Sequence, residues 1–306
     1  MRSKTASRRS RELVPRLGAH MSIAGGMPLA VERAASVGAT ALQVFVKSSN
    51  QWGARPFLAG ETEAFRAAAR AADLHRHTVA HASYLINLAS PDDALWRRSV
   101  ESLGEELERC SALGIPSLVV HPGSHVGTGA GKGLDRVARA LDASFGARPV
   151  EGIRPAAVSK DLAVLLEVTA GQGNTLGSTF EELAAILDRA ASARRLGVCF
   201  DTCHALAAGY EFRDARSYRE TFRDFDRTVG IARLKAFHLN DSKGGLGSRL
   251  DRHEHIGRGQ VGLEAFRLIL LDPRFRGLPM LLETPKGEDL AEDRDNLAIL
   301  REMVGR

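Results

Sequence analysis

The stretch 197–210, GVCFDTCHALAAGY, begins as an apolar run and then presents side chains that bind metal ions. Asp201 closes the run, and His204 follows three residues later, which is about one helical turn further on. Carboxylates and imidazoles are common ligands of divalent cations. The stretch therefore predicts a strand that delivers a carboxylate and a following turn that delivers an imidazole to the same region.

Side chains of the same kind lie at the ends of other apolar runs, where we find His81, His121, Glu167, His238 and Glu283. A later loop adds Asp251 and His253, whose alternate spacing points both side chains the same way in an extended chain. With Asp201 and His204, these residues make a set of five histidines and four carboxylates. We expect the whole set to meet in one place.

Such a set is typical of a metal centre. Four carboxylates packed together would repel one another and take up protons, whereas divalent cations would turn that repulsion into attraction. The many imidazoles favour zinc over magnesium, which prefers oxygen ligands. Three tetrahedral ions need about twelve ligand bonds, so nine side chains with one bridging carboxylate would leave about two positions open, as catalytic sites do. Three dications with four carboxylates would also carry a net positive charge that attracts a phosphodiester.

Short apolar runs alternate with amphipathic stretches and must position these residues. The expected strands are 17–22, 41–47, 78–83, 117–123, 163–168, 196–201, 234–240 and 280–284, with helical patterns between them such as 61–74, 94–114, 180–192 and 218–230. Eight such units predict a single (β/α)8 TIM barrel with the active site at the carboxyl ends of the strands. A doubly wound open sheet would share the alternation, but it would normally gather its ligands at one switch point.

Composition limits the class of protein. With 306 residues, 44% of them apolar and 26% charged, the chain is expected to be soluble and globular. No run approaches the roughly 18 apolar residues of a membrane helix, and no secretory signal is present, which predicts a cytoplasmic protein without a membrane partner. The three cysteines form no disulfide framework. The net charge of +5 permits a nucleic-acid partner without establishing one.

Residues 1–16 carry six basic side chains against one acid and predict a disordered tail ahead of a barrel domain at 17–306.

The longer motifs resemble those of the endonuclease IV family of apurinic/apyrimidinic (AP) endonucleases. They are HASYLINL (81–88), HPGSH (121–125), LEVTAGQG (166–173), GVCFDTCHALAAGY (197–210), HLNDSKGGLGSRLDRHEHIGRG (238–259) and LLET (281–284). The resemblance implies a zinc-dependent hydrolase of the deoxyribonuclease IV type. Such an enzyme cuts double-stranded DNA on the 5′ side of an abasic site, leaves a 3′-hydroxyl and a 5′-deoxyribose phosphate, and trims blocked 3′ ends. A monomer is expected.

The resemblance further implies three zinc ions per chain, with Glu167, Asp201 and Glu283 as the catalytic carboxylates. A hydroxide held between the ions would attack the phosphorus in line. The implied ligands are His81, His121 and a bridging Glu167 for one ion; Glu167, Asp201, His238 and Glu283 for the second; and His204, Asp251 and His253 for the third.

DNA recognition is assigned by the same resemblance to residues beside these ligands. Tyr84 and Leu85 look like a wedge that fills the gap left by the extruded abasic sugar. Lys243 and Arg252 are expected to line the path of the DNA backbone. These positions predict a bent duplex bound across the mouth of the barrel.

The sequence also departs from the family pattern in places. Gln51 and Trp52 match the usual end of the loop 47–52, but Asn50 stands where some members insert an arginine into the base stack, and Asn cannot stack as a guanidinium does. Val168 stands where an asparagine often follows the bridging glutamate, which puts a hydrogen bond to a ligand in question. The stretch 146–160 is longer than usual, and we expect it at the opposite face of the barrel.

Two other classes of protein share parts of this pattern. A sugar isomerase or epimerase on a similar barrel would also bind metals, but its site would be richer in carboxylates and would hold one or two ions. A non-catalytic lesion-binding protein would keep the basic path and the wedge while losing ligands. A thiolate site built on Cys199 and Cys203 is disfavoured, because Cys199 precedes Asp201 by two residues and should point into the core.

Overall fold

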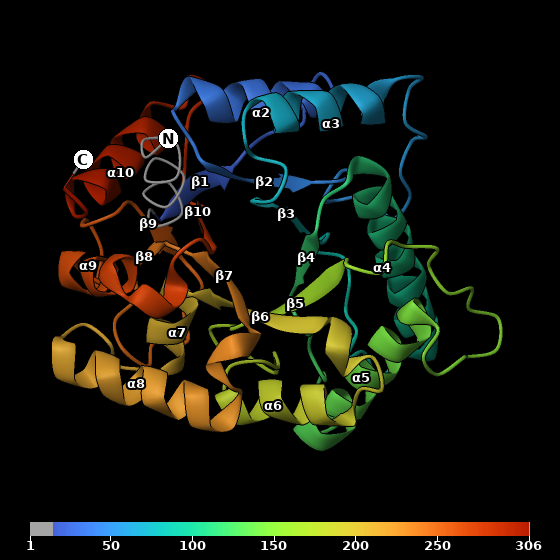
Figure 1. The fold of residues 1–306 in the computed structure, drawn as a ribbon. Helices are drawn as coiled ribbons and strands as arrows, with labels where there is room; N and C mark the ends of the chain where they lie inside the picture. The colour runs from blue at the N-terminus through green and yellow to red at the C-terminus, as the bar shows by residue number, and fades with distance from the viewer. Residues whose placement is uncertain (1–14, 306) are drawn as a thin grey trace, which may run out of the picture.

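The computed structural model describes residues 15–305, and its strands close into a barrel surrounded by helices (Figure 1). The eight parallel strands are β1 (Arg16–His20), β2 (Ala41–Phe45), β3 (Thr78–His81), β4 (Ser117–Val120), β5 (Ala163–Glu167), β6 (Leu196–Asp201), β7 (Leu234–His238) and β10 (Pro279–Leu282). Strand β1 pairs with both β2 and β10, so the sheet has no free edge. The predicted TIM barrel is confirmed, and the open sheet is excluded.

Helices connect successive strands and cover the outside of the barrel (Figure 1). They are α2 (Met27–Ser36), α3 (Glu61–Ala71), α4 (Asp93–Leu113), α5 (Ala130–Phe145), α6 (Phe180–Arg189), α7 (Thr202–Ala208), α8 (Ala215–Thr228), α9 (Leu263–Leu271) and α10 (Ala291–Glu302), with the short 3-10 helices η1 (Ala193–Arg195), η2 (Ile231–Arg233) and η3 (Pro273–Phe275). Strands β8 (Asp241–Ser242) and β9 (His253–Glu254) form a small antiparallel ribbon after β7. Within residues 15–305, none of the helices is long and apolar enough to cross a membrane.

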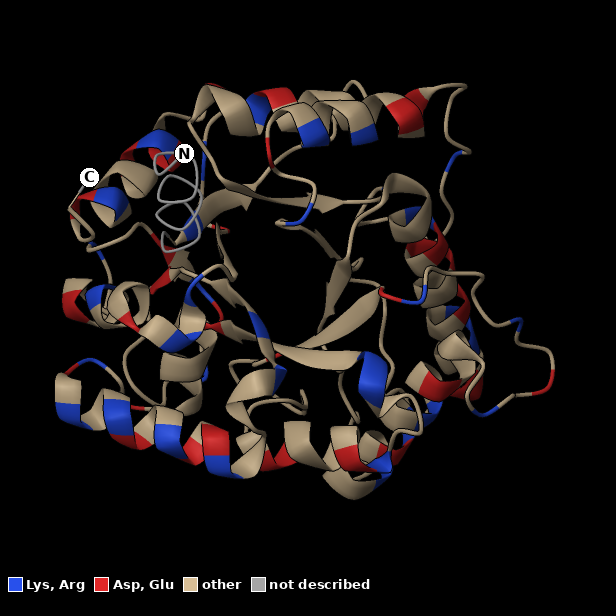
Figure 2. Ribbon diagram, in the orientation of Figure 1, with Lys and Arg blue, Asp and Glu red and all other residues tan. Residues whose placement is uncertain are grey.

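Local sequence signals explain where several helices begin and end. Helix α4 begins after Asp92, whose side chain accepts a hydrogen bond from the backbone N–H of Leu95, and it ends at Gly114 in the left-handed conformation. Helix α8 begins with a capping box between Asp214 and Ser217. Charged residues lie mainly on these outer helices and on loops, whereas the barrel strands carry few (Figure 2). The charge pattern therefore separates the solvent side of each helix from the side that packs on the barrel.

The interior of the barrel is packed and is not a pore. Seven strands each contribute one buried side chain to an inner layer, namely Ala41, Val79, Val119, Leu165, Cys199, Ala236 and Leu281. Cys199 thus packs inside the barrel, as predicted, and burial raises the pKa of its thiol to about 12. The layer closes the barrel below the carboxyl ends of the strands, so a ligand can enter only from the mouth above it.

The boundaries of the elements differ slightly from those predicted. Seven of the eight strands end one to three residues earlier than the apolar runs, because the chain leaves the sheet where the polar loop residues begin. Arg16, which the sequence places in the basic tail, is the first residue of β1, and residues 1–14 of the predicted tail lie outside the described residues. The long stretch 146–160 connects α5 to β5 at the amino-terminal face, where Arg154 pairs with Glu108 of α4 at 2.7 Å.

One buried carboxylate near the start of the barrel gives a prediction for acid stability. Glu61 forms a two-pronged ion pair with Arg55 and accepts hydrogen bonds from the backbone N–H groups of Leu58 and Met27. These partners, Arg55 first, lower the pKa of Glu61 to about 2. Because the folded pKa lies below the ordinary value of 4.5, this contribution to stability is present above about pH 4.5 and is lost as the pH falls toward 2.

We therefore expect the free energy of unfolding to depend less on pH between about 4.5 and 2 in Glu61→Gln than in the wild type. Urea unfolding at a series of pH values measures this dependence. The exposed Glu63, whose partners Arg66 and Thr62 belong to its own helix, supplies a control substitution, Glu63→Gln. Equal slopes for Glu61→Gln and the wild type would contradict the prediction.

Candidate metal centre

The predicted ligands lie together at the carboxyl end of the barrel because the strands deliver them there. His81, Glu167, Asp201 and His238 are the last residues of β3, β5, β6 and β7, while His121 and Glu283 directly follow β4 and β10. All these strands are parallel, so their carboxyl ends share one face. The structure thus brings residues that are far apart in the sequence to a common mouth.

The junction between β6 and α7 positions two members of the set. Asp201 is the last residue of β6 and the N-cap of α7, and its Oδ1 accepts a hydrogen bond from the backbone N–H of His204 at 2.8 Å. His204 therefore lies in the first turn of the helix, and both side chains are buried. The acid and the imidazole have a fixed separation because a single capping interaction holds them, as the spacing in the sequence suggests.

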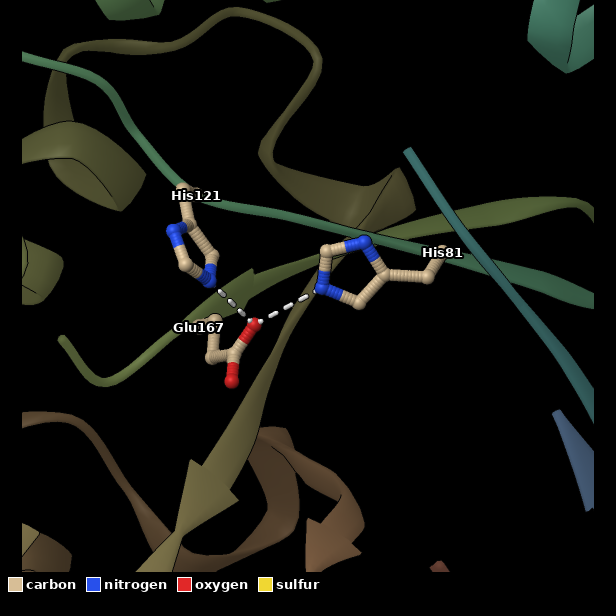
Figure 3. A group of neighbouring side chains, drawn as sticks. All are labelled: His81, His121 and Glu167. Carbon is tan, nitrogen blue, oxygen red and sulfur yellow. Dashed lines mark hydrogen bonds and ion pairs between the residues drawn. The ribbon is translucent and has the colours of Figure 1, made fainter. Parts of the chain in front are cut away.

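A first group of side chains surrounds one oxygen of Glu167. The Nε2 atoms of His81 and His121 lie 3.2 and 2.9 Å from Glu167 Oε2 (Figure 3). The other ring nitrogen of His81, Nδ1, donates to the carbonyl oxygen of Ala82 at 2.8 Å. These three side chains offer ligand atoms that all lie within 4.8 Å of one another.

A second group surrounds His238 and shares Glu167 with the first. His238 Nδ1 lies 2.8 Å from Glu167 Oε1, 3.3 Å from Glu283 Oε2 and 3.7 Å from Asp201 Oδ2. Its Nε2 lies 2.8 Å from Oε1 of Gln43. Because Glu167 directs one oxygen to each group, it has the position that a bridging carboxylate requires.

The third group contains His204, Asp251 and His253. Asp251 Oδ1 lies 3.0 Å from His204 Nε2 and 3.6 Å from His253 Nε2, and the two Nε2 atoms are 3.4 Å apart. Asp201 Oδ2 lies 3.7 Å from His253 Nε2, so Asp201 stands between the second group and the third. The sequence assigned Asp201 to the second ion only, and its place beside His253 is a finding of the structure.

The orientation of the histidines tests whether this donor set suits metal ions. Besides His81 and His238, two more rings place one nitrogen on a carbonyl oxygen. His204 Nδ1 lies 3.0 Å from Val168 O, and His253 Nδ1 lies 3.3 Å from Glu283 O. A ring that donates from one nitrogen presents a lone pair at the other, which is how histidine binds metals.

In the third group these lone pairs belong to the two Nε2 atoms 3.4 Å apart, with a carboxylate oxygen beside them. Three acceptors in contact repel one another unless they share a proton or a metal ion. The set therefore fits bound metal ions. Val168, which departs from the family pattern, serves through its backbone, because its carbonyl oxygen orients His204 without help from a side chain.

The electrostatics of the site favour positive charge. Burial alone would raise the pKa of Glu167, but the positive charges of His238 and His121 and hydrogen bonds from His121 and His204 hold it well below its ordinary value. Burial alone would lower the pKa of His204, but the Asp201 carboxylate and hydrogen bonds to the neighbouring acids raise it well above. The Glu167 carboxylate thus remains charged at neutral pH and attracts cations.

Three positioning residues escaped the sequence analysis. Gln43 lies inside β2, where its amide contacts His238 and also donates to Glu283. Asn240 donates to Asp201 Oδ2 and accepts from the backbone N–H of Glu283, both at 2.7 Å. A polar residue that interrupts an apolar run, as in ALQVF (41–45), is the signal that could have indicated Gln43.

Asp241 is the third positioning residue that the sequence did not indicate. Its buried carboxylate accepts hydrogen bonds from the backbone N–H groups of Gly257 and Val261 at 2.9 and 2.8 Å. These bonds close the loop that carries Asp251 and His253. Gly259 packs so closely on Asp241 that an added Cβ would lie 2.5 Å from the carboxylate, so this position requires glycine.

Three of the residues predicted to bind DNA, Tyr84, Lys243 and Arg252, line a cleft at the mouth. The cleft has a volume of about 430 Å³, and its lining includes His121, His204, Tyr84, Lys243 and Arg252. Tyr84 is 65% exposed, and desolvation within the cleft together with the negative charges of Glu283 and Glu167 raises its pKa to about 12, so the phenol is neutral. Ligand-type residues, cationic side chains and an exposed aromatic ring therefore share one cavity.

The loop 47–52 lies outside that cleft. Asn50 and Gln51 are exposed, whereas Trp52 is partly buried and Arg98 of α4 lies over its ring at 4.6 Å. That face of Trp52 is therefore covered and cannot stack on a base. The three residues, which the sequence predicts to contact DNA together, thus divide into two exposed residues and one that supports the loop.

Comparison with known proteins identifies the group to which this architecture belongs. Residues 31–303 match the family described as xylose isomerase-like TIM barrel. A protein named probable endonuclease 4 from Chloroflexus aggregans is 52% identical over 291 residues, which cover 95% of this chain and 98% of that protein. The crystal structure of endonuclease IV from Thermus thermophilus has a TM-score of 0.81 and 40% identity, with 95% of this chain and 99% of that chain covered.

More distant structures share the barrel alone. A D-tagatose 3-epimerase-like protein has a TM-score of 0.67 and 18% identity, with 94% of this chain and 97% of that chain covered. At that level of identity the likeness shows the fold and carries no argument about activity.

Proposed function

This chain belongs to the endonuclease IV family of the xylose isomerase-like TIM barrels, and we propose that it is a metal-dependent DNA repair enzyme that acts on abasic sites. It hydrolyses the phosphodiester on the 5′ side of an abasic site in double-stranded DNA, leaves a 3′-hydroxyl and a 5′-deoxyribose phosphate, and trims blocked 3′ ends. We assign it three zinc ions and place it in the cytoplasm as a monomer.

The observation that carries this proposal is the arrangement of lone pairs in the mouth of the barrel. Four histidine rings have one nitrogen on a carbonyl oxygen and direct the other toward a carboxylate of the proposed ligand set. Imidazole-rich sets of this kind suit zinc better than magnesium. The proposed ligands are His81, His121 and Glu167; Glu167, Asp201, His238 and Glu283; and His204, Asp251 and His253, with Asp201 close to the third set.

The chemistry divides between the ions and the side chains. Bound zinc ions would acidify water, neutralise charge on the phosphate and stabilise the leaving oxygen. The chain itself fixes the ligands and binds the substrate. Glu167, Asp201 and Glu283 supply carboxylates at the centre. Gln43 fixes the directions of Glu283 and His238, and Asn240 fixes that of Asp201.

Substrate binding uses the residues around the cleft. Lys243 and Arg252 stand at its edge and are suited to backbone phosphates on either side of the lesion. Tyr84 and Leu85 would occupy the space of the missing base, and Asn50 and Gln51 would contact the duplex from the neighbouring loop. Because an abasic nucleotide has no base to unstack, its extrusion into the cleft costs less than that of a normal nucleotide.

The proposal is tested by metal content and activity measured on the same preparation. We expect about three zinc ions per chain and incision of a duplex with a single abasic site, with no incision of the matched intact duplex. Elemental analysis and gel separation of the end-labelled products measure both. Product mobility distinguishes cleavage on the 5′ side from cleavage on the 3′ side. A protein that held one magnesium ion and converted a ketose would refute the proposal in favour of an epimerase.

A further inference from the structure

A buried ion pair lies behind the two loops that flank the mouth. Lys47 follows β2 by two residues, and Glu106 projects from α4; both side chains are 1% exposed, and Lys47 Nζ lies 3.5 Å from Glu106 Oε1. Lys47 also donates to Ser102 Oγ at 2.8 Å. Burying two charges costs several kcal/mol per ion, and apolar residues often serve stability as well or better. The pair is therefore better explained by what its atoms hold in place.

Each member of the pair is bonded to the backbone of a different loop. Lys47 Nζ donates to the carbonyl oxygen of Trp52 at 2.6 Å, which closes the loop 47–52 on itself. Glu106 accepts the backbone N–H of Ser83 through both carboxylate oxygens, at 3.3 and 3.2 Å. One ion pair thus anchors the loop after β2 and the loop after β3 on the same turn of α4.

A third bond joins the loops directly. Ser83 Oγ donates to the carbonyl oxygen of Ser49 at 2.6 Å. The anchored residues are the immediate neighbours of those that face the substrate, because Ser49 precedes Asn50 and Ser83 precedes Tyr84. Movement at either anchor would therefore displace an exposed side chain at the mouth.

We propose that Lys47 and Glu106 are positioning residues that lock these two loops into one rigid surface and thereby set the affinity for abasic DNA. The inference rests on the proposed function. It assigns the pair to lesion binding and not to hydrolysis, since neither side chain reaches the three ligand groups. Preorganised contacts gain affinity because less ordering remains to be done on binding.

Three substitutions isolate the bonds. Glu106→Gln keeps an acceptor for the Ser83 N–H but removes the buried one of the two carboxylates that face Lys47; the other, Glu105, lies 3.3 Å from Lys47 Nζ and is partly exposed. Ser83→Ala removes the hydroxyl that joins the loops and that also accepts the backbone N–H of Leu85. Lys47→Met removes the ammonium; burial already raises the pKa of Glu106 to about 7 against the pull of Lys47, so the carboxyl that remains is expected to be protonated at neutral pH.

Asp142→Asn is the matched control. Asp142 is fully buried on α5 and accepts the backbone N–H groups of Ala191 and Ser192, in a loop that precedes β6 at the opposite face of the barrel. Asp142→Asn therefore removes a buried carboxylate that anchors a loop, as Glu106→Gln does, but at a position far from the mouth.

Single-turnover incision of an abasic duplex by the zinc-loaded protein, titrated with enzyme, separates affinity from chemistry. We expect Glu106→Gln and Lys47→Met to raise the half-saturating enzyme concentration by on the order of 10-fold and Ser83→Ala by about 3-fold, with the maximal rate and zinc content unchanged. Asp142→Asn is expected to match the wild type. In the Glu106→Gln background, Tyr84→Ala should cost less affinity than it does in the wild type, because the loop is already displaced.

Two results would overturn the inference. One is an unchanged half-saturating concentration in the folded Glu106→Gln and Ser83→Ala variants. The other is additive effects of Glu106→Gln and Tyr84→Ala. Failure of the proposed function gives a different result, since the wild type and Asp142→Asn would then both leave the abasic duplex intact.

Discussion

Glu167→Gln is expected to lower kcat/KM for incision of an abasic duplex by about 10³-fold or more, or ~4 kcal/mol of transition-state stabilisation. Glu167 is fully buried and directs one oxygen to His81 and His121 and the other to His238. An amide has the same shape but lacks the charge and cannot bridge two cations as a carboxylate does. The substitution therefore removes a ligand from two proposed ions at once.

The same variant should lose zinc as well as activity. We expect the bound metal to fall from about three ions to one or two, and the third group, which does not contain Glu167, should retain its ion. Circular dichroism and the unfolding midpoint show whether the barrel is intact. Asp142→Asn again serves as the control for the loss of a buried carboxylate. Full zinc content together with wild-type incision in Glu167→Gln would contradict the assigned role.

The positions of the site residues could be predicted because of how parallel strands end. A barrel places the carboxyl ends of all its strands on one face, so His81, Glu167, Asp201 and His238 could be grouped from their places at the ends of apolar runs. The spacing of Asp201 and His204 indicated a shared helix start for the same reason. Periodicity and strand order were sufficient for these inferences.

Other features depend on side-chain directions that periodicity does not encode. The approach of Asp201 to His253 requires the loop between β8 and β9 to fold back over the mouth. Asp241 holds the segment after β9 through backbone N–H groups sixteen and twenty residues further along the chain. The Lys47–Glu106 pair joins a loop to a helix. From the sequence alone, Glu106 would be placed on the solvent-exposed side of that helix. Only the packing of α4 against the loop shows that both charges are buried.

Removing the metal ions should reduce stability more than any single substitution considered above. The four carboxylates of the proposed ligands lie close together, and two of them, Glu167 and Asp201, are fully buried. Without cations their mutual repulsion and the crowded Nε2 lone pairs of His204 and His253 oppose folding. A bound metal ion adds about 4 kcal/mol to the free energy of unfolding when its free concentration is about 1,000 times its Kd.

For a chain of this size we therefore expect a chelator to lower the thermal midpoint by on the order of 10 °C, and zinc to restore it. Calorimetry with parallel metal analysis makes the measurement, and magnesium added after chelation should restore much less because the donors are rich in imidazole. A His204→Ala variant, which lacks one ligand of the third group, should show a smaller loss on chelation than the wild type. A wild-type protein shown to be free of zinc yet melting at the same temperature would contradict the assignment, since protonated histidines alone would then be sufficient to balance the buried acids.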